Sequence, residues 1–122
     1  MIKHETASRL WIAIGYLGST LIIILSLVPG SARPHSGVGG NYEHGIAYAL
    51  VGFAFAMGYR AIRERLLSGL ALAVGAAILE LLQNFIPGRN PEVAGFVAST
   101  TGAWLGLAVA IFAAAVLRSI AK

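Results

Sequence analysis

The chain has 122 residues, of which 57% are hydrophobic, 11% are charged and none is cysteine. Its length allows one domain, and its charged fraction is far below the roughly one quarter of a soluble domain, so lipid must cover much of the surface. The lack of cysteine excludes a disulfide scaffold, thiol catalysis and a cysteine-ligated metal. The net charge of +4 comes from basic residues between apolar segments, so we expect no nucleic-acid partner.

The first apolar run, residues 10–28, has about the length that spans a bilayer. Basic residues precede it and small residues follow at 30–32, which is also the pattern of a cleaved signal peptide. Because the run is longer than the apolar part of such a peptide, we favour a retained transmembrane helix. The loop that follows, 29–42, is rich in Gly, Pro and Ser, which interrupt regular structure.

A second, short transmembrane helix is predicted over residues 42–59, with its first turn among the lipid headgroups. Seven of the residues from 45 to 59 are Gly or Ala. Small side chains let helices approach closely in lipid. We therefore expect this helix to be the most buried of the bundle.

A basic turn over residues 60–65 leads to a third predicted transmembrane helix over 66–86. A fourth is predicted over 91–117, where an asparagine, a proline and a glutamate at 90–92 form a typical helix start.

Small residues recur every four positions in this fourth helix, at Ala98, Gly102, Gly106 and Ala110. The glycine pair is either a homodimer seam or a contact with the second or third helix of the same chain. We favour the contact within one chain.

The basic residues predict the orientation in the membrane. With both termini cytoplasmic, seven basic residues lie inside and only Arg33 and Arg89 lie outside, which satisfies the positive-inside rule. We therefore predict an all-α, polytopic membrane protein in which residues 1–122 form one domain of four transmembrane helices with cytoplasmic N- and C-termini. The inner residues are Lys3, Arg9, Arg60, Arg63, Arg65, Arg118 and Lys122.

Polar residues near the end of the third helix indicate a site. Glu80 and Gln83 lie on one side of that helix, and a carboxylate in hydrocarbon is costly unless it is paired. Glu80 is thus a site residue or the donor or acceptor of an internal hydrogen bond, and Gln83 has the same two interpretations. Arg89, in the following turn, is suited to a phosphate or carboxylate, or to lipid headgroups.

The predicted topology brings further polar residues to this outer end. His44 and Tyr48 share a face of the second helix, and Ser99 lies a little over two turns into the fourth. A solvated His44 and a Ser99 bonded back to its own helix are the plainer alternatives. The prediction is a polar pocket open to the outer leaflet, without a metal or another cofactor. Its binding residues are His44, Tyr48, Glu80, Gln83, Arg89 and Ser99.

Four motifs carry a family resemblance: LSLVP at 25–29, HGIAYALVG at 44–52, ELLQNFIPGR at 80–89 and TGAWLG at 101–106. With them the chain resembles the VanZ-like family of small integral membrane proteins. The resemblance implies a multi-pass protein of the bacterial cytoplasmic (inner) membrane. It also implies a role in the cell envelope and antibiotic resistance, because the family is named for a protein that lowers susceptibility to the glycopeptide teicoplanin.

The chain departs from the family pattern at two places. Residues 41–43 read Asn-Tyr-Glu where the family has an Asp-Lys pair before the histidine. Gly95 and Ser99 stand where the family has Asp and, one turn later, Asn. The loss of an acid and an amide argues against a catalytic or ion-binding role.

Three functions fit these observations. The favoured one is non-catalytic binding of an envelope lipid intermediate or a glycopeptide-type ligand, with membrane lipids as the surrounding partners. The second is an accessory subunit packed against a larger membrane protein complex. The third is a lipid-modifying enzyme with His44 and Glu80 as acid and base, for which the spacing contains no catalytic motif.

Overall fold

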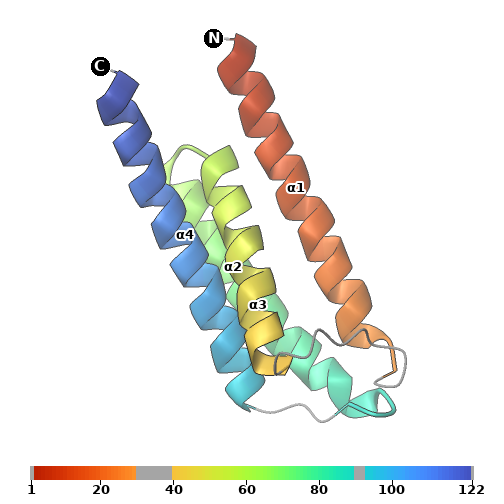
Figure 1. The fold of residues 1–122 in the computed structure, drawn as a ribbon. Helices are drawn as coiled ribbons and strands as arrows, with labels where there is room; N and C mark the ends of the chain where they lie inside the picture. Colours follow the sequence, from red (N-terminus) through yellow and green to blue (C-terminus); the bar gives the residue numbers. More distant parts are fainter. Residues whose placement is uncertain (1, 30–39, 90–92, 122) are drawn as a thin grey trace.

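The computed structural model describes residues 2–29, 40–89 and 93–121, and this part of the chain is a bundle of helices (Figure 1). The all-α prediction is confirmed, with four long helices in the described residues. Both termini and the turn between the second and third helices lie at the same end, which we call the terminal end. The elements are α1 (Ile2–Leu27), α2 (Gly40–Gly58), α3 (Ile62–Leu82), the short 3-10 helix η2 (Gln83–Phe85) and α4 (Val93–Ala121).

Two helices begin at least four residues earlier than predicted. α1 begins at Ile2 and not at residue 10, and α3 begins at Ile62, so the predicted basic turn shortens to residues 59–61. Polarity marked the predicted boundaries, but Arg, Lys and Glu are good helix formers and continue a helix beyond its apolar part. The start signals at 90–92, and most of the loop after α1, lie outside the described residues.

Three of the four helices, α1, α3 and α4, are long and apolar enough to cross a membrane. The chain is therefore a multi-pass membrane protein. α2 is not among these three helices, and its first turns carry polar and charged residues, including Glu43 and His44. It nevertheless has the largest share of buried residues, as predicted, and its Ala54 and Ala56 are almost completely enclosed.

α2 and α4 form a seam in which their backbones are in contact, and we call it the α2–α4 seam. A Cβ atom at Gly102 or Gly106 would clash with the carbonyl oxygen of Gly45 or Ala49 on α2. The glycine pair of α4 therefore packs within one chain, which confirms the favoured interpretation. A side chain at either glycine would force the two helices apart.

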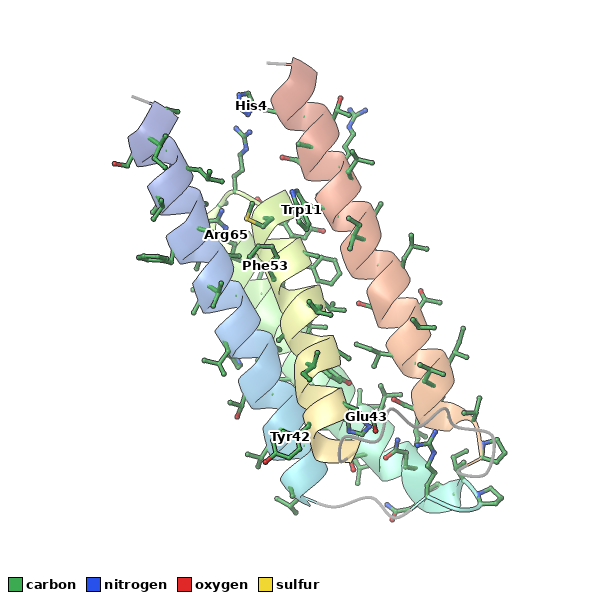
Figure 2. All side chains as sticks on the ribbon, in the orientation of Figure 1. His4, Trp11, Tyr42, Glu43, Phe53 and Arg65 are labelled. Carbon is green, nitrogen blue, oxygen red and sulfur yellow. The ribbon has the colours of Figure 1, made fainter. Side chains whose placement is uncertain are left out.

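α1 packs on α2 through side chains. Gly15 lies under the Phe55 ring, and Trp11 meets Phe53 edge to face at a centroid distance of 5.5 Å (Figure 2). Along α3, in contrast, α1 leaves a cavity of about 610 Å³, which we call the α1–α3 groove. The bundle is thus tight along one pair of helices and open along another.

Candidate functional site

A carboxylate and an imidazole lie close together inside the bundle, at the end opposite the terminal end. We call this opposite end the η2 end. Glu80 Oε1 of α3 lies 3.9 Å from His44 Nδ1 of α2, and the two side chains are only 15% and 23% exposed. Burial of a carboxylate is tolerated when an opposite charge and hydrogen bonds accompany it. Glu80 therefore faces the interior and not the acyl chains.

Gly95 of α4 forms the third wall around this carboxylate. A Cβ atom at Gly95 would lie 2.7 Å from Glu80 Oε1 and 3.2 Å from its carboxyl carbon. Glu80 thus occupies the volume that any side chain at position 95 would need. This close approach is a physical reason for a glycine at the position where the family that the chain resembles has an aspartate.

Two more of the predicted residues are buried on the two helices that contact Glu80. Tyr48, one turn beyond His44 on α2, is 5% exposed and close enough to Glu80 to interact with it electrostatically. Ser99, one turn beyond Gly95 on α4, is 2% exposed. The structure therefore gathers three helices around Glu80, and we call His44, Tyr48, Glu80 and Gly95 the Glu80 cluster.

Gln83 and Arg89 bind the last turn of α1. Gln83 Nε2 donates a hydrogen bond to the Ser26 carbonyl at 3.0 Å, and Arg89 Nε donates to the Val28 carbonyl at 3.0 Å. Arg89 Nη2 also donates to the Leu25 carbonyl. The last carbonyls of a helix lack partners within the helix and carry partial negative charge, so a guanidinium there stabilises the helix end. We call these contacts the α1 clamp.

A tight turn places Arg89 for this contact. Gly88 has a φ of 75°, a backbone conformation that glycine adopts at little cost, and the Arg89 amide donates to the Ile86 carbonyl at 3.3 Å. The Pro-Gly-Arg motif therefore reverses the chain and returns the guanidinium to α1. The prediction that Arg89 contacts a bound anion stays a prediction.

The α1 clamp was not predicted from the sequence, although one signal for it exists. The last turn of α1 holds no basic residue, so its carbonyls require donors from elsewhere in the chain. The two cavities of the structure were not predicted either. In the described part of the chain, neither the α1–α3 groove nor a second cavity of about 640 Å³ at the terminal end has Glu80 or Arg89 in its lining. The outer polar pocket therefore stays a prediction.

After comparison with known proteins, the family resemblance rests on the sequence motifs alone. The residues that carry it include the two sides of the Glu80 cluster, on α2 and α3, and the Pro-Gly-Arg turn of the α1 clamp. No family model, no curated protein and no solved structure matches the chain.

Proposed function

We propose that the chain is a VanZ-like protein of the bacterial cytoplasmic membrane, with four transmembrane helices and both termini in the cytoplasm. The distribution of charge supports this orientation. Arg60, Arg63 and Arg65 lie at or next to the α2–α3 turn of the terminal end, whereas Arg89 lies at the η2 end. Basic residues of short loops remain on the cytoplasmic side.

Single cysteines test the orientation directly, because the chain has no cysteine of its own. In intact cells, a membrane-impermeant maleimide should label Asn84→Cys at the η2 end. It should label Ser119→Cys, near the C-terminus, only after lysis. The reverse pattern would contradict the proposed orientation.

We further propose that the η2 end binds, without catalysis, the polar head of an envelope lipid intermediate or a glycopeptide-type ligand. The observation that carries this proposal is the enclosed Glu80–His44 pair, in which the Glu80 carboxylate lies against Gly95. Ionisable groups inside a membrane bundle are costly and are mostly retained for function. A carboxylate accepts hydrogen bonds from the hydroxyl and amide groups of a sugar or peptide head, while imidazole and guanidinium groups suit its phosphate or carboxylate.

In this proposal the α1 clamp forms the wall of the site. Gln83 and Arg89 hold the end of α1 against the end of α3, so they would fix one side of the proposed site. Arg89 also contributes a permanent positive charge at the outer membrane surface, where an anionic head would arrive first.

Binding measured on purified protein in nanodiscs tests the function. The probes are a polyprenyl diphosphate and teicoplanin, each titrated onto wild type and Glu80→Gln, a variant that keeps the shape of the side chain. We expect about tenfold weaker binding of at least one probe, because a hydrogen bond to a charged group is lost.

The control is Asn84→Ala, which removes an exposed amide at the same helix end whose hydrogen bond goes to the nearby Leu81 carbonyl at 3.1 Å. It should bind as wild type does. Equal affinity of wild type and Glu80→Gln would contradict the proposal, as would a wild type that binds neither probe. Stoichiometric co-purification with another membrane protein would instead favour the accessory-subunit function.

A further inference from the structure

The α1–α3 groove is an apolar cavity that lies between two membrane-spanning helices. Its sides are formed by α1 and α3, and Tyr48 and Phe55 of α2 contribute to its lining. From Glu64 to Leu79 the α3 wall is about 22 Å long at 1.5 Å per residue. This length lies within the roughly 30 Å hydrocarbon thickness of a bilayer. The groove therefore suits a hydrocarbon chain.

The second cavity, which we call the charged mouth, lies at the terminal end between the start of α1 and the α2–α3 turn. It measures about 640 Å³ and is lined by charged and polar side chains (Figure 2 shows His4 at this end). The lining of the charged mouth includes two arginines, two glutamates and one histidine. These residues are His4, Glu5, Arg9, Arg60 and Glu64.

The charged mouth and the groove adjoin each other. Tyr59 and Glu64 line both cavities. At their junction the Tyr59 and Tyr16 hydroxyls lie 3.4 Å apart. Aromatic residues with a polar tip are enriched where a membrane protein meets the boundary between headgroups and hydrocarbon. Together the two cavities therefore change from charged to apolar at the depth where a lipid does.

We propose that the two adjoining cavities together bind one phospholipid with a phosphate and a primary ammonium in its headgroup, such as phosphatidylethanolamine. Arg9 and Arg60 supply guanidinium groups, which bind phosphate oxygens with paired hydrogen bonds. Glu5 and Glu64 supply carboxylates for the ammonium. Equal numbers of the two charges match a zwitterion better than an anionic lipid. An acyl chain fills the groove.

Gly75 allows the groove to be filled without disturbing the protein. This residue lines the groove, and a Cβ atom built on it meets no heavy atom within 4 Å. Gly75→Leu should therefore place its side chain in the volume proposed for the acyl chain. Val74→Leu is the matched control, because Val74 is the adjacent residue, is 51% exposed and is not part of the groove lining.

Native mass spectrometry of the detergent-purified full-length chain tests the proposal, after incubation with phosphatidylethanolamine, phosphatidylcholine or phosphatidylglycerol. We expect one phosphatidylethanolamine per chain on wild type and on Val74→Leu, and none on Gly75→Leu. Arg60→Gln should retain it about fivefold less well, the effect of one ion pair near the surface. Arg63→Gln, which changes an exposed arginine in the first turn of α3 and outside the mouth, should leave retention unchanged.

Three outcomes would overturn the proposal. Gly75→Leu could retain the lipid as wild type does, or all three lipids could be retained equally, which would indicate ordinary annular lipid. The spectra could also show a dimer whose formation Gly75→Leu blocks, which would assign the groove to a second copy of the chain. None of these outcomes bears on the function proposed for the η2 end, because that test uses other probes and Glu80→Gln at the opposite end.

Discussion

The α2–α4 seam and the α1–α3 groove show how the same residue type has opposite consequences in one bundle. At the seam, Gly102 and Gly106 are required because a backbone lies where their side chains would be. In the groove, Gly75 faces open space. The seam joins α2 and α4 closely, and the groove leaves α1 and α3 apart except at the η2 end, where the α1 clamp joins them. Of the two binding proposals, the phospholipid site lies along this loosely joined pair.

The largest effect is expected from breaking the seam. Gly106→Leu would place a side chain on the Ala49 carbonyl of α2 and separate two backbones. We expect a loss of free energy of unfolding at the upper end of the roughly 1–3 kcal/mol that overpacking costs. Unfolding in mixed detergent micelles, followed by circular dichroism, measures it. An unfolding midpoint equal to that of wild type would mean that α2 and α4 are not in backbone contact.

A smaller loss is expected when the α2–α4 pair loses one of its links to α3. Arg65 is 8% exposed, and its Nε donates to the Ala56 carbonyl at 2.8 Å and the Tyr59 carbonyl at 2.9 Å (Figure 2). Arg65→Gln should lower the free energy of unfolding by about 2 kcal/mol, since hydrogen bonds from a charged group are lost. Arg63→Gln, the exposed neighbour in the same helical turn, should change it little. Equal effects of the two variants would contradict this role of Arg65.

The α1 clamp should affect the position of α1 more than overall stability. Arg89→Gln removes the hydrogen bonds from the guanidinium to the end of α1, which we expect to cost about 1 kcal/mol. Spin labels on Leu21→Cys and Leu82→Cys, in a chain without native cysteine, should then report a broader and longer distance distribution. A distribution identical to that of the labelled protein with Arg89 intact would show that other contacts hold α1.

The smallest effect is expected where the groove leaves room. Gly75→Ala should be neutral or should stabilise the protein by up to about 1 kcal/mol, because alanine is the better helix former and no atom lies in its way. Gly102→Ala, the matched substitution at the seam, should destabilise the protein in the same unfolding assay. If both variants behaved alike, the distinction between seam and groove would be lost.

Part of the site could be predicted from spacing and topology. Glu80 on the third helix and His44 on the second were assigned to the same end of the bundle, and the structure places them 3.9 Å apart. The position of Gly95 against that carboxylate could not be predicted, because it depends on how closely two helix backbones approach. The roles of Gln83 and Arg89 toward α1 were missed because their partners are backbone carbonyls, which every residue carries.

By itself, the sequence determined the lipid environment, the all-α class, the number of long helices and the polar character of the η2 end, because these depend on composition, run length and helical spacing. Only the tertiary structure decided which glycines touch a backbone, which arginine binds the end of which helix and where a groove remains. Those outcomes depend on the tilt and separation of the helices, which arise from the packing of all of them together and not from any one segment.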